Sequence, residues 1–195
     1  MYSPKEFIET RLDVLHGLIE ANPLGAVVRH GADGLSADHI PFEIVAPSEE
    51  APFGTLRAHV ARANPLWQQD GQSIMVLFQA ESAYITPAWY EEKARSGKVV
   101  PTWNYAAVHA HGVLRSVDDP AWLLALLTRL TARNEANRAA PWAVQDAPAD
   151  YLARLTQAIV GIELRIERID GKFKQSQNKS PADRARIAEG LRSGL

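Results

Sequence analysis

The stretch VPTWNYAAVHAHG, residues 100–112, carries the strongest fold signal in this chain. With its flanks it predicts one long strand over Val99–Val117, in which side chains alternate between two faces. One of those faces combines two aromatic rings and two imidazoles with a small residue: Trp103, Tyr105, Ala107, His109 and His111. Flat rings stack on planar heterocycles, and imidazoles donate hydrogen bonds to ring carbonyls or phosphates. This face is therefore either a ligand-binding surface or a core or dimer-interface strand.

The elements on both sides of this stretch predict the fold class. Further strands are expected over Leu24–Arg29, Leu35–Val45, Gly54–Val60, Ile74–Phe78 and Ile159–Ile169, with a turn at 31–34. Helices are expected from Ser3-Pro4 to Asn22, after Asn64-Pro65, over Glu91–Arg95, after Asp119-Pro120, over Tyr151–Ala158 and after Ser180-Pro181. Strands and helices do not alternate strictly, and no glycine pattern of a dinucleotide or P-loop site occurs. We expect a mostly antiparallel β-barrel with peripheral helices, in a single domain of residues 1–195 that ends in a basic loop and helix at 171–195.

Composition narrows the class of protein. The 195 residues are 46% hydrophobic and 23% charged, as in soluble globular proteins. The absence of cysteine excludes disulfides, thiolate zinc sites, iron–sulfur clusters and a cysteine nucleophile. No segment approaches the roughly 20 apolar residues of a membrane span, and the N-terminus lacks the apolar core of a secretion signal. We expect a cytoplasmic protein that is not embedded in a membrane.

Charge is concentrated at one end of the chain. The whole chain has a net charge of −2, but residues 172–195 hold six Lys and Arg against two Asp and Glu, a net charge of +4. The basic part GKFKQSQNKS, residues 171–180, is either an anion site just before a helix or a solvated polar loop. The +4 charge of residues 172–195 is also the one feature that favours binding to DNA, since no helix-turn-helix pattern occurs.

A second basic cluster follows the strand at 54–60. Arg57, His59 and Arg62 place two guanidinium groups and an imidazole close together, just before Asn64-Pro65 begins a helical turn. Guanidinium groups bind phosphate oxygens in pairs, and helix N–H groups add to them. The alternative is a set of exposed arginines on an edge strand.

His109 and His111 project from one strand face and are also half of a conceivable metal site. The sequence places no third ligand near them, so we expect hydrogen-bonding histidines and no metal. A serine hydrolase is disfavoured because no nucleophile-elbow pattern surrounds any serine.

Four ordered motifs resemble one known family. They are HIPF at 39–42, GTLRAHVARANP at 54–65, VPTWNYAAVHAHG at 100–112 and GKFKQSQNKS at 171–180. Together with MYSPKEF at 1–7, AYITPAWY at 83–90 and the segment at 141–163, they resemble the PaiB family of FMN-binding negative transcriptional regulators over nearly the whole chain. Gln175 departs from the family pattern, in which an apolar residue is expected.

The resemblance implies a split β-barrel of the FMN-binding type, similar to pyridoxamine-phosphate oxidases and assembled as a homodimer with the flavin at the dimer interface. It implies that the cofactor FMN is held by residues of three motifs: Arg57, His59, Arg62, Asn64, Trp103, Asn104, Tyr105, His109, Lys172 and Lys174. A negative transcriptional regulator is the function implied. The alternative is a flavin-dependent oxidoreductase acting on a small molecule, which needs no catalytic side chain because the flavin itself supplies the hydride chemistry.

Overall fold

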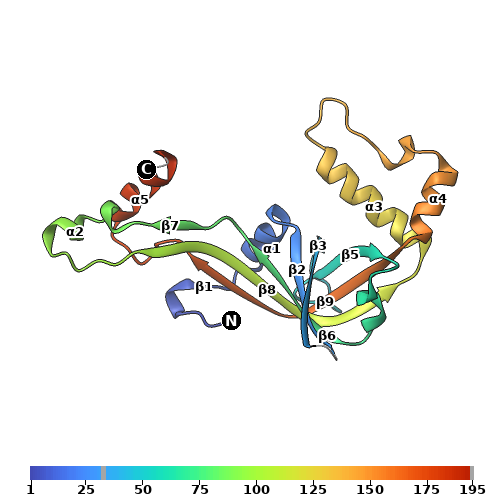
Figure 1. Cartoon of the computed structure of the whole chain (residues 1–195), viewed down its shortest axis with the longest axis horizontal. Helices are drawn as coiled ribbons and strands as arrows, with labels where there is room; N and C mark the ends of the chain where they lie inside the picture. Colours follow the sequence, from blue (N-terminus) through green and yellow to red (C-terminus); the bar gives the residue numbers. More distant parts are fainter. Residues whose placement is uncertain (32–33, 194–195) are drawn as a thin grey trace. The chain divides into compact units, whose positions relative to one another are not determined.

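Antiparallel strands form the framework of the computed structural model, which describes residues 1–31 and 34–193 (Figure 1). The described strands make a nine-stranded sheet with the order β3-β2-β6-β8-β9-β5-β4, while β1 pairs with β9 and β7 with β8. Their bounds are β1 Ile8–Glu9, β2 Leu24–Gly31, β3 Gly34–Pro41, β4 Glu43–Val45, β5 Thr55–Ala61, β6 Ser73–Gln79, β7 Ala83–Ile85, β8 Thr102–Val117 and β9 Ile159–Lys174. The predicted class, a mostly antiparallel β fold with helices, is confirmed.

The chain divides into two compact units, each built from separated segments. The first unit contains residues 1–22, 78–109 and the described residues from 170 onward. The second unit contains residues 23–77 and 110–169, apart from the undescribed pair 32–33. The expectation of a single domain over residues 1–195 remains a prediction.

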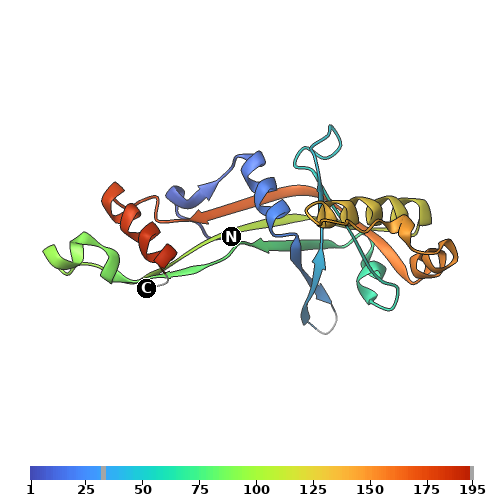
Figure 2. The same cartoon turned by 90° about the horizontal axis from the view of Figure 1, so that it is seen from above.

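The second unit has its core on one face of the sheet. On β5, Leu56, Ala58 and Val60 are buried whereas Arg57 and His59 are half-buried, which is the alternation expected of a strand. The helices α3 (Pro120–Glu135) and α4 (Ala149–Gln157) pack on one another (Figure 2). The 3-10 turns η2 (Pro65–Gln69) and η4 (Val144–Asp146) complete this unit.

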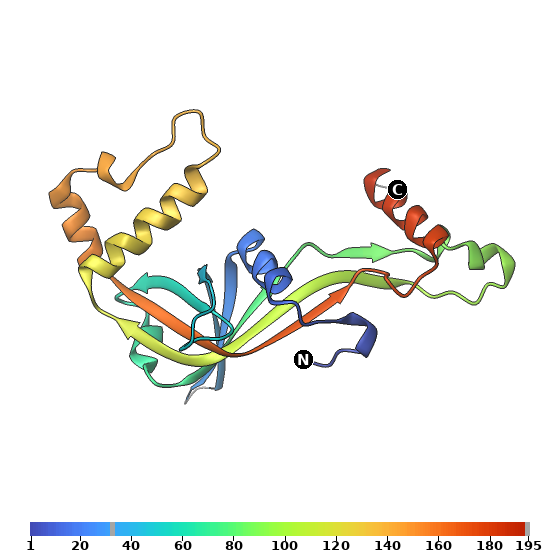
Figure 3. The ribbon, with the colours of Figure 1, turned by 180° about the vertical axis from the view of Figure 1, so that it is seen from behind.

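The first unit contains a small core between short elements and the C-terminal helix. Ile85 of β7, Tyr90 and Ile187 of α5 (Pro181–Ser193) form one buried cluster, against which Trp89 packs. The helix α5 lies beside the strand β7 (Figure 3). Gly190 permits the contact, since a Cβ there would lie 2.2 Å from the Trp89 ring. The remaining elements are η1 (Lys5–Phe7), α1 (Leu12–Ala21), η3 (Pro87–Trp89) and α2 (Glu91–Arg95).

Four predicted boundaries were wrong. The strand expected over Val99–Val117 begins only at Thr102. The expected helix from Ser3 to Asn22 begins only at Leu12, because Ile8 and Glu9 pair with Lys172 and Gly171 of β9. The expected strand Leu35–Val45 is interrupted at Phe42, whose N–H donates to the Pro23 carbonyl at 2.8 Å. The last strand continues beyond Ile169 to Lys174. Part of the turn predicted at 31–34 lies outside the described residues.

Helix starts were predicted well where a cap is local. Asp119 caps α3 by accepting from the Ala121 N–H at 2.8 Å, and Ser180 accepts from the Asp183 N–H at 3.1 Å. None of the described helices is long and apolar enough to cross a membrane.

Candidate functional site

The predicted site residues fall into two groups, one in each unit. The second unit holds Arg57, His59, Arg62 and Asn64. The first unit holds those of the aromatic strand and the basic segment: Trp103, Asn104, Tyr105, His109, Lys172 and Lys174. Each group is described by itself.

Arg57 and His59 share one face of β5, beneath α3. The Nε of Arg57 donates to Glu163 at 2.8 Å, and its guanidinium carbon lies 5.9 Å from the centre of the Trp122 ring. Burial lowers the pKa of His59. The buried Nδ1 of His59 has no hydrogen-bond partner among the described residues. The bond to Glu163 uses one of the five N–H donors of Arg57, and no other hydrogen bond of its guanidinium group is found among the described residues.

Arg62 and Asn64 are engaged within the fold itself. Arg62 makes a two-pronged ion pair with Asp118, at 2.9 Å and 2.7 Å, and also donates to the carbonyls of Gln157 and Ile159. The Asn64 amide donates to Asp38 at 2.9 Å, and its oxygen accepts from the Leu66 N–H at 2.9 Å. Both residues therefore stabilise the end of β5 and the start of η2.

The aromatic residues of β8 are partly open to solvent. Trp103 is 54% exposed and stands edge-on to Tyr84 of β7, with ring centres 5.8 Å apart. His109 is half-buried on the same strand. In the second unit, His111 contacts Arg168, with 2.8 Å between Nε2 and Nη2. The described residues contain no group of three or more His, Cys, Asp or Glu suited to a metal ion.

The two predicted lysines are strand residues with different surroundings. The Lys172 ammonium lies 5.4 Å from the centre of the Tyr105 ring and 5.7 Å from that of Tyr2, whose carbonyl it contacts at 3.1 Å. The Lys174 ammonium instead donates to the hydroxyl of Thr102. Because they are two residues apart on β9, both project to the same side of the strand.

Two cavities of the first unit lie against these residues. The first, here called the Tyr105 cavity, has a volume of about 490 Å³. Its lining combines polar groups with the apolar side of α5: Glu81, Ser82, Ala83, Asn104, Tyr105, Gln175, Ser176, Arg184, Ile187, Ala188 and Leu191. The second, here called the Lys174 cavity, has a volume of about 240 Å³ and shares Asn104 and Ser176 with the first. The Ser176 hydroxyl donates to the Asn104 oxygen at 3.0 Å.

The chemistry of the Tyr105 cavity fits a flavin ring. Its volume lies within the roughly 300–1,000 Å³ usual for small-molecule sites. Tyr105 offers an aromatic ring for stacking, and Asn104, Gln175 and Ser176 offer hydrogen-bond donors and acceptors. Arg184 adds a cation for which no ion pair is found among the described residues.

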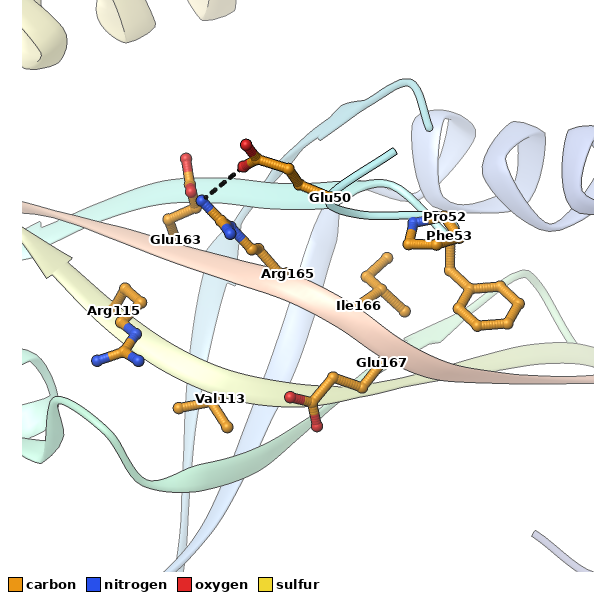
Figure 4. Close-up of a pocket in the computed structure, with 9 residues that line it drawn as sticks. All are labelled: Glu50, Pro52, Phe53, Val113, Arg115, Glu163, Arg165, Ile166 and Glu167. Atoms are coloured by element: carbon orange, nitrogen blue, oxygen red, sulfur yellow. Dashed lines mark ion pairs between the residues drawn. The ribbon is translucent and has the colours of Figure 1, made fainter. Parts of the chain in front are cut away.

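A further cavity of about 770 Å³ lies in the second unit, and none of the predicted site residues lines it (Figure 4). Among the residues that the structure describes, four of its five charged side chains, all but Glu167, are placed in ion pairs. Arg165 contacts Glu50 at 3.2 Å, Glu163 contacts Arg57 at 2.8 Å, and Arg115 contacts Asp70 at 3.9 Å. This pairing leaves little unsatisfied charge to attract an ionic ligand.

Sequence reasoning missed several residues that line the cavities of the first unit. Tyr90, Asn178 and Lys179 line the Lys174 cavity, and Arg184 lines the Tyr105 cavity. Tyr90 ends the motif AYITPAWY, and Asn178 and Lys179 belong to GKFKQSQNKS. The motifs were therefore visible, but nothing local indicates that the two segments meet.

Comparison with known proteins gives one family match and full-length relatives. The family described as "Putative FMN-binding domain" matches residues 1–168. An uncharacterized protein of Aspergillus fumigatus is 34% identical over 236 residues, which cover 98% of this chain and 90% of that protein. Protease synthase and sporulation protein PAI 2 of Bacillus subtilis is 29% identical over 195 residues, which cover 99% of this chain and 90% of that protein.

Solved structures show the same fold at low sequence identity. The FAD and heme binding protein from Mycobacterium smegmatis superposes with a TM-score of 0.62 at 20% identity, covering 94% of this chain and 80% of that chain. The flavocytochrome Anf3 from Azotobacter vinelandii superposes with a TM-score of 0.63 at 14% identity, covering 92% and 75%. At these identities the likeness concerns the fold alone.

Proposed function

Because the chain belongs to the family of FMN-binding domains whose model matches its residues 1–168, we propose that it binds FMN and acts as a PaiB-type negative transcriptional regulator. The resemblance to the PaiB family, predicted from four sequence motifs, is confirmed by this membership and by the near full-length match to PAI 2. FMN binding and regulation by this chain are the proposal.

The observation that carries FMN binding is the Tyr105 cavity. In this proposal Tyr105 stacks on the isoalloxazine ring, while Asn104, Gln175 and Ser176 hydrogen-bond to its polar edge. When bound, FMN would supply one- and two-electron redox chemistry. The set predicted for its phosphate, Arg57, His59, Arg62 and Asn64, stays a prediction.

A homodimer and a regulatory role belong to the same proposal. The exposed pair of Trp103 and Tyr84 supports an interface on the β7–β8 edge, because protein interfaces are enriched in aromatic residues. The regulatory role follows from the resemblance to the PaiB family of negative transcriptional regulators, which the match to PAI 2 of B. subtilis supports. Direct DNA binding through residues 172–195 stays a prediction, which a gel shift at increasing salt tests.

Titration with FMN tests the proposal. The wild-type protein should quench FMN fluorescence in a saturable way, and Tyr105→Leu should weaken the affinity for FMN at least about fivefold. The reason is that stacking on an aromatic side chain contributes about 1–3 kcal/mol. Tyr151→Leu, which removes an exposed tyrosine of the second unit, is the matched control and should leave the affinity unchanged. Absence of FMN binding by the wild-type protein would contradict the proposal.

A further inference from the structure

The Lys174 cavity has the composition of an anion site, and we propose that it binds a phosphate group. The residues that carry this inference come from three segments of the first unit: Tyr90, Thr102, Lys174, Ser176, Asn178 and Lys179. Four features of the cavity support phosphate binding. They are the positive charge of its lysines, the unpartnered hydroxyl of Tyr90, the backbone conformation of Ser176 and the cavity volume.

The cavity holds two ammonium groups and no acidic residue. Lys174 and Lys179 line it, and its complete lining contains neither Asp nor Glu. Among the described residues, neither ammonium group is in an ion pair. Lys174 donates to Thr102, and the Lys179 ammonium lies 4.7 Å from the centre of the Tyr90 ring. Two neighbouring cations without a counter-charge favour a multiply charged anion.

Tyr90 supplies a buried hydroxyl without a partner. The residue is 3% exposed, and within the described part of the chain its Oη has no hydrogen-bond partner. Leaving a buried hydroxyl unsatisfied costs free energy, so its retention calls for an explanation. Burial, and to a lesser degree the Asp183 carboxylate, raise the pKa of Tyr90. The group therefore stays protonated at neutral pH and can donate a hydrogen bond to an anion.

The backbone after β9 is held in an unusual conformation at this cavity. Ser176 is buried and has a φ of 60°, the one non-glycine residue with positive φ among those described. Such conformations are costly for residues with a Cβ and occur often at ligand sites. The turn is closed by the Lys179 N–H donating to the Ser176 carbonyl at 2.9 Å. It brings Asn178 and Lys179 to the cavity that Lys174 lines from the strand.

Size limits what the cavity can hold. A volume of about 240 Å³ is below the range of roughly 300–1,000 Å³ for sites that bury whole drug-sized ligands. A phosphate group fits, whereas an entire flavin nucleotide does not. The phosphate can belong to FMN bound in the adjoining Tyr105 cavity, which rests on the proposed function, or to a separate small phosphorylated molecule.

Calorimetric titration of the full chain with inorganic phosphate tests the proposal without any flavin. We expect saturable binding by the wild-type protein and at least a tenfold loss in the double variant Lys174→Met, Lys179→Met. Lys93→Met removes the same charge from an exposed position of the first unit that does not line the cavity, and should change the affinity less than twofold. Equal binding by the wild-type protein and the double variant, or no binding by the wild-type protein, would overturn the proposal.

Tyr90→Phe keeps the test decisive where the lysine variant does not fold. Removing an unpartnered hydroxyl should leave the melting temperature without phosphate unchanged or raised. It should also reduce the increase in melting temperature that phosphate causes in the wild-type protein. A Tyr90→Phe protein that phosphate stabilises as much as the wild type counts against the site.

A competition experiment identifies the source of the phosphate. If saturating inorganic phosphate weakens the binding of FMN but not of riboflavin, and this effect is lost in the double variant Lys174→Met, Lys179→Met, the cavity takes the phosphate of FMN. If it weakens neither flavin, the cavity takes a separate ligand. Both outcomes require that phosphate binds, so failure of the phosphate site and failure of FMN binding give different results.

Discussion

At the scale of single residues, burial makes His59 sensitive to acid. Its pKa is lowered by burial, whereas an unfolded histidine titrates near 6.5. The folded state therefore binds fewer protons below that pH, and stability that is complete above about pH 6.5 is lost as the pH falls. For one such group, the free energy of unfolding changes by at most about 1.4 kcal/mol for each pH unit.

We predict that His59→Gln reduces the loss of stability between pH 7.5 and 5.5, because glutamine does not titrate. Urea unfolding at several pH values measures this. His39→Gln, which changes an exposed histidine, should keep the wild-type pH dependence. An unchanged slope in the His59 variant would show that another group causes the acid sensitivity.

Glu9 also makes the protein less stable as the pH falls, but at lower pH than His59 does. Its hydrogen bonds with the Arg11 side chain, at 3.0 Å and 2.7 Å, are the main reason that its pKa is lowered to about 2. Its stabilising effect is thus present above about pH 4.5 and is lost as the pH falls toward 2.

We predict that Glu9→Gln destabilises the protein at pH 7 by about 1–2 kcal/mol, as expected for loss of charge-assisted hydrogen bonds. The difference from wild type should shrink steadily below pH 4.5. Glu6→Gln, at an exposed glutamate nearby, is the control. Denaturant unfolding at pH 7 and pH 3 measures both effects, and a difference that grows at pH 3 would refute the explanation.

The sequence predicted which residues share a face but not which residues meet. The alternation of β5 placed Arg57 and His59 together correctly. The partner of Arg57 is Glu163 and that of Arg62 is Asp118, which are 106 and 56 residues away along the chain. Periodicity carries no information about such distant pairings. The engagement of Arg62 with Asp118 was therefore invisible in the sequence.

At the scale of elements, some local signals predicted helix starts correctly, whereas the signal at Ser3-Pro4 did not, because the pairing of Ile8 and Glu9 with β9 could not be read from the sequence. The start of α3 was predictable because Asp119-Pro120 is a self-contained cap. The continuation of β9 through Gly171 and Lys172 was not predictable, because the segment looks polar and the strand β1 that pairs with it lies at the other end of the sequence. Gly171 is also needed there, since a Cβ would lie 2.3 Å from Leu15 of α1.

The docking of α5 provides a prediction at this scale. Gly190→Ala should destabilise the protein by about 1–3 kcal/mol, because the added Cβ would lie 2.2 Å from the Trp89 ring. It should also weaken FMN binding, because α5 lines the Tyr105 cavity. Gly17→Ala is the matched control in α1, where no heavy atom lies within 4 Å of the added Cβ.

The control variant Gly17→Ala should raise the free energy of unfolding by up to about 1 kcal/mol, since alanine is a better helix former than glycine. Thermal unfolding and FMN titration of both variants measure the contrast. If Gly190→Ala were as stable as Gly17→Ala, the close packing of α5 on Trp89 would not matter for stability.

At the scale of the whole molecule, the proposal of a homodimer can be tested through the exposed aromatic pair. Light scattering should give a mass near twice the 21.5 kDa of the chain. We predict that Trp103→Glu shifts the protein toward the monomer, because a charge at the centre of an interface is strongly disfavoured. Trp142→Glu changes another exposed tryptophan, 47% exposed in the second unit, and should leave the mass unchanged. A monomeric wild-type protein would refute the homodimer.

The division of the chain into two units has a consequence for how this protein can evolve and be engineered. The chain passes from one unit to the other four times, near residues 22, 77, 109 and 169. No uninterrupted piece of the gene therefore encodes either unit. A single recombination between two related genes would therefore leave at least one unit with segments from two different parent proteins. Grafting one unit requires several simultaneous exchanges, so we expect change in this family to arise by substitution at individual positions and not by shuffling of modules.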